Sequence, residues 1–289
     1  MPELPEVETT RLGLLPVLGQ VVAKVTVRNA VMRWPIPAHI TETLNGLTLT
    51  QLERRAKYIL ATFSGPHTTN LINANAENAL AKKDTLLLHL GMSGRLCLLE
   101  RDFPPEKHDH FDLLFTDGRV VRLRDPRRFG AVLWMEGDVN QHVLLASLGP
   151  EPFDDGFTGD YLFKHMRTRT SAIKVTIMDA HLVVGVGNIY ASESLFRSRI
   201  NPQTPAKQLT RKQCERLVTE IKSTLSDALK AGGSSLRDFF GADGNPGYFQ
   251  QSYFVYGRTD EPCHVCSKPI MNIRLGQRST FFCAACQKR

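Results

Sequence analysis

Four cysteines near the end of the chain constrain its fold more than any other sequence feature. They form two C-x2-C pairs separated by sixteen residues: Cys263, Cys266, Cys283 and Cys286. This spacing is typical of four thiolates arranged tetrahedrally around one zinc ion. Disulfide pairing is the alternative, but disulfides are rare in cytosolic proteins. We therefore expect a small module at this end of the chain, held together by one structural Zn2+.

Length and charge set the broad class of protein. A chain of 289 residues, 42% of them hydrophobic, can bury a sizeable core and typically forms two domains. No apolar run is long enough to cross a bilayer, and the acidic N-terminus does not resemble a signal peptide. We expect a cytoplasmic protein with no membrane partner. A net charge of +7 and a pI near 9.2 favour a polyanionic partner, most simply nucleic acid.

The first half of the chain has the pattern of β-strands. Alternating apolar residues and β-branched side chains predict strands at residues 21–27, 47–52, 57–63, 85–90, 111–115, 119–124 and 131–135. Asp117-Gly118 lies between two of these runs and is a favourable hairpin turn. Seven such runs before residue 136 indicate a β-sandwich. A short helix is predicted at residues 7–18, and residues 64–84 form a polar excursion too long for an ordinary hairpin loop.

After Gly149-Pro150 the pattern changes to helices. Short helices are predicted at residues 161–169, 172–179, 189–197 and 235–240, the last leading into a Gly-rich loop at 241–247. Asn188 is placed to cap the helix that starts at Ile189. A capping box at Thr210-x-x-Gln213 opens a longer helix, which Gly232-Gly233 ends. One face of this helix is apolar and comprises Cys214, Leu217, Val218, Ile221, Leu225 and Leu229.

The first residues suggest covalent chemistry. Removal of Met1 would leave Pro2 as a secondary amine with a pKa near ~8, partly unprotonated at neutral pH. Such an amine can attack a carbonyl-like carbon and form an iminium. Glu3 and Glu6 place carboxylates within reach for acid–base catalysis. The alternative is a simple helix start, because Pro5 suits the first turn and glutamates suit the positive end of a helix dipole.

A glycine turn at residues 185–188 precedes the predicted helix. It is not a dinucleotide fingerprint, because Tyr190 stands where the third glycine belongs and no βαβ unit surrounds it. A glycine turn at a helix start still presents backbone N–H groups to an anion, and a DNA phosphate would suit a basic protein. A compact corner without a ligand is the alternative.

Four side chains in other glycine-rich or basic segments have a functional and a plain interpretation. Phe129, in the segment Asp-Pro-Arg-Arg-Phe-Gly at 125–130, is either a wedge into nucleic acid or a buried core residue. Met92, on a glycine-flanked turn, either protrudes or belongs to the core. Lys57, at the start of a strand, either has a pKa lowered by partial burial or is solvated. Arg278, at the expected hairpin tip of the cysteine module, either grips phosphate or only makes the tip basic.

Together these segments resemble the formamidopyrimidine-DNA glycosylase family of bacterial enzymes, which excise oxidised purines. The resemblance covers nearly the whole chain. It rests on PELPEVET (2–9), HLGMSG (89–94), KHDH (107–110), DPRRFG (125–130), VVGVGNIYASESLF (183–196), PGYF (246–249) and the four cysteines. The main departure is the excursion at 64–84, where the family usually has a short connection.

The resemblance implies an α+β multidomain protein. A β-sandwich catalytic domain with an N-terminal helix would span 1–136, a helical helix–two-turn–helix domain 137–250, and a four-cysteine zinc finger 251–289. A monomer would bind damaged double-stranded DNA between the domains. The implied activity is that of a bifunctional DNA glycosylase and AP lyase in base excision repair. A Schiff base on the N-terminal proline would release the base, and β,δ-elimination would follow.

The resemblance also implies roles for individual residues. The catalytic set would be Pro2 as nucleophile at C1′, Glu3 as acid, Lys57 and Arg278. The DNA-contacting set would be His89, His108, Arg127, Arg169, Lys174 and Asn188. The lesion-recognition and wedge set would be Glu6, Met92 and Phe129, with Arg127 helping to fill the gap left by the flipped nucleotide.

Two alternative functions compete with this interpretation. An endonuclease VIII-like glycosylase has a related architecture but takes oxidised pyrimidines. Leu4, together with Met92, Arg127 and Phe129, favours the oxidised-purine branch. A non-catalytic zinc-containing DNA-binding protein is the other alternative, and the presence of the Pro2-Glu3 start and Lys57 argues against it.

Overall fold

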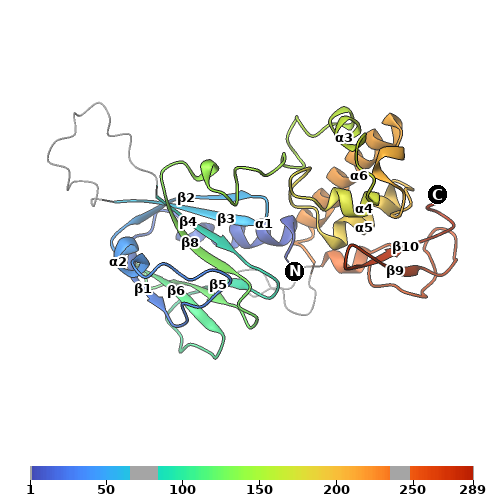
Figure 1. Cartoon of the computed structure of the whole chain (residues 1–289). Helices are drawn as coiled ribbons and strands as arrows, with labels where there is room; N and C mark the ends of the chain where they lie inside the picture. The colour runs from blue at the N-terminus through green and yellow to red at the C-terminus, as the bar shows by residue number, and fades with distance from the viewer. Residues whose placement is uncertain (1, 66–83, 235–247, 289) are drawn as a thin grey trace. The chain divides into compact units, whose positions relative to one another are not determined.

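The computed structural model describes residues 2–65, 84–234 and 248–288 (Figure 1). They divide into two compact units. The first unit comprises residues 2, 6–65 and 84–146, and the second comprises residues 3–5, 147–234 and 248–288. Most of the predicted excursion (66–83), the predicted helix at 235–240 and the Gly-rich loop at 241–247 lie outside the described residues.

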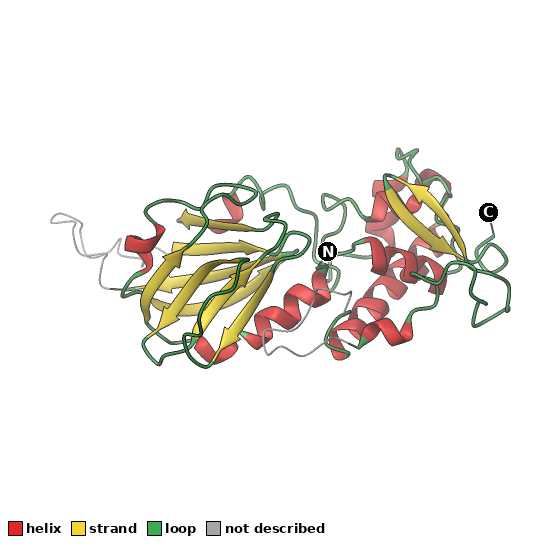
Figure 2. Cartoon of the chain, turned by 90° about the horizontal axis from the view of Figure 1, so that it is seen from below, coloured by secondary structure: helices red, strands yellow, loops and turns green. Residues whose placement is uncertain are grey.

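The first unit contains two four-stranded antiparallel sheets, which confirms the predicted sandwich (Figures 1 and 2). One sheet has the order β2 (Thr48–Arg55), β3 (Tyr58–Ser64), β4 (Asp84–His89) and β8 (Ala131–Glu136). The other has the order β1 (Val22–Val27), β6 (Asp109–Phe115), β7 (Val120–Arg124) and β5 (Arg95–Leu99). A single apolar core takes side chains from both sheets, among them Leu86, Leu88, Phe111 and Phe115.

Local sequence signals explain most of this unit. The hairpin predicted at Asp117-Gly118 is present: Phe115 N–H donates to Arg119 O at 2.9 Å, and Gly118 has a φ of +90°. The sequence did not predict β5. This strand lies at the edge of its sheet, and only Leu96 among its residues is fully buried, so its apolar pattern is weak.

The helices of the first unit differ from prediction in their bounds. The N-terminal helix α1 (Leu4–Gly13) begins three residues before the predicted start, and a short 3-10 turn, η1 (Leu15–Val17), follows it. The early start reflects Leu4, which is fully buried. Two short elements, α2 (Ile40–Leu44) and η3 (Val139–Gln141), were not predicted, because neither is long enough to show helical periodicity.

The second unit is helical before its C-terminal hairpin. It contains α3 (Gly159–Met166), α4 (Ile173–Ile177), α5 (Asn188–Arg197), η4 (Ala206–Gln208), α6 (Arg211–Lys230) and η5 (Phe249–Ser252). The predicted capping box of α6 is present, with Thr210 and Gln213 bonded reciprocally. The predicted apolar face of α6 is buried as far as Leu225, and Ala228 rather than Leu229 then continues the buried stripe.

A two-stranded hairpin forms the C-terminal part of the second unit. Strands β9 (Met271–Leu275) and β10 (Arg278–Phe282) pair in antiparallel register. A small core beneath them joins Phe196 of α5 to Val255, Ile270 and two of the cysteines. Helix α5 is therefore packed against the cysteine module. Among the described residues, no helix is both long and apolar enough to span a membrane.

Candidate functional site

The glycine turn before α5 binds the carboxylate of Glu3. Glu3 is 2% exposed. Its Oε2 accepts the Gly187 N–H at 2.9 Å, its Oε1 accepts the Ile189 N–H at 3.0 Å, and the Tyr190 N–H approaches Oε2 at 3.4 Å. These N–H groups belong to a helix N-terminus, where an anion is favoured. The prediction of a DNA phosphate at this turn is therefore wrong, because the chain's own carboxylate occupies it.

The two glycines of this turn are needed for the close approach. A Cβ on Gly187 would lie 2.2 Å from the Glu3 Cδ, and a Cβ on Gly185 would lie 2.5 Å from a Leu4 methyl. Gly185 also has a φ of +80°, which favours glycine. The Leu4 N–H donates to the Gly185 carbonyl at 3.2 Å. The turn thus fixes the residues that directly follow Pro2.

Pro2 is the buried neighbour of Glu3 in the chain. Consecutive Cα atoms are about 3.8 Å apart, so anchoring Glu3 restricts the position of the proline ring to within one peptide unit. Glu6 is buried in the first turn of α1, as the helix-start interpretation requires. The roles of Pro2 as nucleophile, Glu3 as acid and Glu6 in lesion recognition stay predictions.

Asn188 does not cap α5 as predicted. Gly187 is the N-cap residue, and Asn188 is the first residue of the helix. Its side chain points elsewhere: Oδ1 accepts the Lys174 Nζ at 2.6 Å, and Nδ2 donates to the Ser279 carbonyl at 3.0 Å. Asn188 therefore joins α4 and the β9–β10 hairpin to the start of α5.

Lys174 is the centre of this connection. It is 1% exposed, and its Nζ donates to Asn188 Oδ1, to the Ser279 carbonyl at 2.9 Å and to Thr280 Oγ1 at 2.8 Å. Burial lowers the pKa of Lys174 to about 8, although the Glu3 carboxylate acts in the opposite direction. Three acceptors match the three protons of an ammonium group. Here Lys174 holds the hairpin, and its predicted contact with DNA stays a prediction.

Arg278 lies beside the tip of the hairpin, as the sequence predicted. It is the exposed first residue of β10, directly after the turn at Gly276 and Gln277, whose φ values are +51° and +63°. The Lys174 bonds to the next two residues hold this end of the hairpin. Arg169 is also partly exposed, but its guanidinium pairs with Asp179 at 2.6 Å.

The four cysteines form a metal-binding group, as predicted. Their Sγ atoms all lie within 4.8 Å of one another, and none is in a disulfide. The Cys263–Cys286 and Cys266–Cys283 Sγ pairs are 3.9 and 3.4 Å apart. Tetrahedral Zn2+ with bonds of about 2.3 Å to sulfur requires Sγ–Sγ separations of about 3.8 Å. The geometry therefore fits one metal ion with four thiolate ligands.

In the first unit, the predicted wedge residues lie on two neighbouring turns. Phe129 is 45% exposed, and the Arg127 guanidinium lies 4.7 Å from the centre of its ring. The plain interpretation of Phe129 as a buried core residue is therefore wrong. Met92 is half-buried on the turn that follows β4. A Cβ on Gly91 would lie 2.4 Å from the Phe129 carbonyl carbon, so the two turns are in backbone contact.

Lys57 and His89 lie beside these turns. Lys57 belongs to the β2–β3 turn, not to the start of a strand as predicted, because Ala56 has a φ of +55° and β3 begins at Tyr58. Tyr58 and His89 face each other in the sheet, with ring centres 4.9 Å apart.

His89 is a neutral hydrogen-bond donor in this setting. Burial, followed by the positive charges of Lys57 and Arg33, lowers its pKa to about 4. Its Nδ1 accepts the Gly91 N–H at 3.0 Å, so the proton of the neutral ring is on Nε2. His108 lies near this site through its main chain: its carbonyl accepts a hydrogen bond from the Asp125 N–H at 3.0 Å. The catalytic role of Lys57 and the contacts of His89 and His108 with DNA stay predictions.

The sequence did not predict a role for Asp125 or Ser93, which join the two turns. Both lie in the motifs noted above, beside the basic and apolar side chains for which a functional role is predicted. The Ser93 hydroxyl donates to Asp125 Oδ1 at 2.6 Å. The one local signal was Asp125-Pro126, since an aspartate before proline favours the start of a turn.

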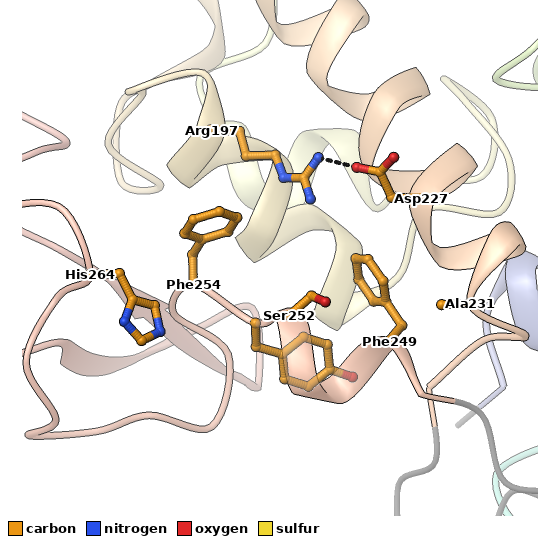
Figure 3. A pocket seen from close by; sticks show the side chains of 8 residues that line it. Arg197, Asp227, Ala231, Phe249, Ser252, Phe254 and His264 are labelled. Atoms are coloured by element: carbon orange, nitrogen blue, oxygen red, sulfur yellow. Dashed lines mark hydrogen bonds and ion pairs between the residues drawn. The ribbon is translucent and has the colours of Figure 1, made fainter.

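A separate pocket of about 490 Å³ lies in the second unit, between α5, α6 and η5 (Figure 3). Its lining includes Arg197, Asp227, Phe249, Phe254 and His264. Arg197 and Asp227 form an ion pair at 2.7 Å, so their charges are already matched. None of the predicted site residues lines this pocket, and it adds nothing to the candidate site.

Comparison with known families and proteins agrees with this arrangement. The formamidopyrimidine-DNA glycosylase N-terminal domain matches residues 1–132, the formamidopyrimidine-DNA glycosylase H2TH domain matches residues 148–240, and the zinc finger found in FPG and IleRS matches residues 260–289. The formamidopyrimidine-DNA glycosylase of Methylobacillus flagellatus is 62% identical over 288 residues, covering 100% of this chain and 97% of the relative. That of Thioalkalivibrio sulfidiphilus is 51% identical, covering 100% of each chain.

Solved structures of Fpg proteins are similar to this chain over nearly its whole length. The crystal structure of the MutM (Fpg) protein from Thermus thermophilus is 34% identical with a TM-score of 0.82, covering 99% of this chain and 98% of that one. A mutant of Lactococcus lactis Fpg, in complex with Fapy-dG-containing DNA, is 32% identical with a TM-score of 0.87, covering 100% of each chain. The matches span the β-sandwich, the helices and the cysteine module, and the chain belongs to the formamidopyrimidine-DNA glycosylase family.

Proposed function

We propose that this protein is a bifunctional DNA glycosylase and AP lyase that excises oxidised purines from duplex DNA in base excision repair. The observation that carries the proposal is the full-length match at 62% identity to a formamidopyrimidine-DNA glycosylase. The local geometry supports it, because the glycine turn before α5 fixes Glu3, the residue directly after Pro2. The protein would act as a monomer in the bacterial cytoplasm, on DNA of the nucleoid.

The proposed reaction uses the amine of Pro2 twice. A base inside a duplex is out of reach, so the damaged nucleotide must first leave the stack, at a cost of a few kcal/mol. The unprotonated amine then attacks C1′, the glycosidic bond breaks, and the base leaves with a proton. Protonation of O4′ and cleavage of the C1′–O4′ bond then convert this adduct into an open-chain iminium. The iminium draws electrons from C2′, so loss of a C2′ proton expels the 3′-phosphate by β-elimination, and δ-elimination then expels the 5′-phosphate. One amine thereby accounts for both base release and strand cleavage.

The other residues of the site would divide the remaining work. Glu3 would exchange protons with the amine and the sugar, from a position fixed by backbone N–H groups. Met92, Arg127 and Phe129 would occupy the gap in the stack and so offset the cost of extrusion. Neutral His89 would donate its Nε2–H to a phosphate oxygen, next to the charge of Lys57.

The cysteine module would position DNA without taking part in bond breaking. Its four thiolates suit a structural Zn2+, which would cross-link the module. Arg278, exposed at the hairpin tip, would then grip a phosphate bidentately. We propose Arg169, Lys174 and Asn188 as further DNA contacts, as the resemblance to the family implies.

Borohydride trapping tests the proposal directly. The full-length protein is incubated with duplexes that carry 8-oxoguanine, an oxidised pyrimidine or no lesion, and the iminium is reduced in place. We expect a covalent protein–DNA adduct, most rapidly with 8-oxoguanine and not with intact DNA. Faster trapping on the oxidised pyrimidine would favour the endonuclease VIII-like alternative. Tight binding without any adduct would favour the non-catalytic alternative.

A further inference from the structure

Asp125 is a fully buried carboxylate at the base of an exposed loop. The loop residues 126–129 are all exposed, whereas Asp125 is 0% exposed. The Asp125 carboxylate accepts the Gly130 N–H at 2.8 Å, and its main-chain carbonyl accepts the Arg128 N–H at 3.2 Å. Asp125 begins the loop that carries Phe129, and its carboxylate and carbonyl also bind the N–H groups near the end of that loop.

The same carboxylate reaches the neighbouring turn that carries Met92. Asp125 Oδ1 accepts the Ser93 hydroxyl at 2.6 Å, and the Ser93 oxygen in turn accepts the Arg127 N–H at 3.2 Å. A hydrogen bond to an ionised carboxylate is stronger than a neutral one, and more so away from water. Residues 93 and 125 therefore form a bridge between two segments that are 32 residues apart in the sequence.

The backbones of the two segments are packed so closely that only glycine fits between them. A Cβ on Gly130 would lie 2.8 Å from the His89 carbonyl and 3.1 Å from Asp125 Oδ2. A Cβ on Gly91, which has a φ of +61°, would lie 2.5 Å from the Gly130 nitrogen. Neither turn can shift far without the other.

We propose that Asp125 is a positioning residue that locks the Met92 turn and the Phe129 loop into a single rigid wedge. The inference rests on the proposed function, in which these side chains fill the gap left by an extruded nucleotide. A loop that is already rigid loses little conformational entropy when DNA binds. More of the free energy of its contacts with DNA is then available to extrude the damaged nucleotide. The Ser93 hydroxyl is the part of this bridge that a substitution can remove without altering the fully buried Asp125.

The first test compares Ser93→Ala with Ser93→Thr. Ser93→Ala removes the bridge, and we expect 8-oxoguanine excision from a stable pair to fall roughly tenfold, as expected for loss of one hydrogen bond to a charged group. Cleavage of a preformed abasic site should change far less, because no base has to be extruded. Ser93→Thr keeps the hydroxyl and should restore the ratio of the two rates.

The second test is a double-mutant cycle with Met92→Ala and Phe129→Ala, measured on excision. In the otherwise unmodified protein the two substitutions should be coupled, and in the Ser93→Ala background their effects should become independent. Asp112→Asn is the stability control, since Asp112 is another buried aspartate of this unit and its carboxylate is bonded to Arg28 and Arg122. It should lower the melting temperature without changing the ratio.

The outcomes separate this inference from the proposed function. Unchanged excision and unchanged coupling in Ser93→Ala, with normal abasic-site cleavage, would overturn the role of Asp125 and leave the function intact. A protein that neither excises 8-oxoguanine nor cleaves abasic sites before any substitution would instead refute the function itself.

Discussion

Replacing Phe129 by alanine should impair base excision while leaving the fold nearly as stable. The ring is 45% exposed, so its removal forfeits only about half of the roughly 1.5–3 kcal/mol gained by complete burial of a large apolar side chain. Loss of the Arg127 guanidinium contact adds about 0.5–1 kcal/mol at an exposed site. A total of about 1.3–2.5 kcal/mol should lower the melting temperature by only a few degrees.

The effect on catalysis should be larger and selective. An aromatic ring stacked on a base contributes about 1–3 kcal/mol, which corresponds to roughly 5- to 150-fold in rate if the contact forms only during extrusion. The assay measures 8-oxoguanine release and abasic-site cleavage on duplexes of the same sequence, each under single-turnover conditions. We expect the first rate to fall by this factor and the second to remain within about twofold, because an abasic site has no base to extrude.

Phe103 provides a matched control in the same unit. Its ring is 42% exposed, and the Arg101 guanidinium lies 4.7 Å from its centre, so it repeats the local environment of Phe129 outside the predicted site. Phe103→Ala should cost similar stability and leave both rates unchanged. If Phe129→Ala slowed both reactions equally, or if Phe103→Ala shifted the ratio in the same way, the wedge interpretation of Phe129 would be refuted.

Three further predictions concern the nucleophile, the metal and pH. An N-terminal extension before Pro2 should abolish borohydride trapping. Pro2→Gly keeps a primary amine and should still trap weakly. Full activity of the extended protein would exclude the amine mechanism. Cys283→Ser should lose the metal, measured by elemental analysis, and weaken DNA binding while the β-sandwich stays folded; a metal-free variant with unchanged affinity would contradict this. The lowered pKa of His89, about 4 against 6.5, means that the unfolded chain binds more protons between these values, so stability should fall by up to roughly 3 kcal/mol as the pH drops from 6.5 to 4. His89→Gln should flatten that part of the melting-temperature profile, and an unchanged slope would show that His89 is not its source.

Local patterns predicted the parts of this protein that depend on near neighbours in the sequence. Strand alternation gave both sheets except the edge strand β5, and the spacing of four cysteines gave the metal-binding group. The capping box at Thr210 and Gln213 was also correct, since both partners lie within one turn. In each case the physical cause acts over a few residues, so it is visible in the sequence.

The errors arose where the partner is far away in the sequence. The glycine turn was correctly interpreted as an anion site, but its anion is Glu3, 184 residues before the Gly187 N–H. Asn188 has the residue type of a cap, yet its side chain binds Lys174 and the Ser279 carbonyl, which lie on α4 and the hairpin. Nothing within a short window could reveal these pairings, because tertiary contacts override the local preference.

Helix α5 is the element that unites these long-range contacts. Its first turn holds the carboxylate of Glu3, and its first side chain, Asn188, binds Lys174 and the hairpin. Further along, Glu193 is fully buried and accepts three N–H groups of the chain before the cysteines, from Phe254 to Tyr256. Residues 189–196 are all buried, and only the two end residues of the helix are partly exposed.

The hydrogen bonds that hold Glu3, next to the proposed nucleophile Pro2, differ from those that hold Arg278. The hydrogen bonds from α5 to Glu3 come from the backbone of the helix and its glycine turn, and none involves the hairpin. The position of Arg278, in contrast, depends on the hairpin that the cysteines and Lys174 hold. Loss of the metal should therefore raise the DNA concentration needed for half-maximal trapping without lowering the trapping rate at saturating DNA. A lower saturating rate in Cys283→Ser would show that the hairpin also positions the N-terminal residues.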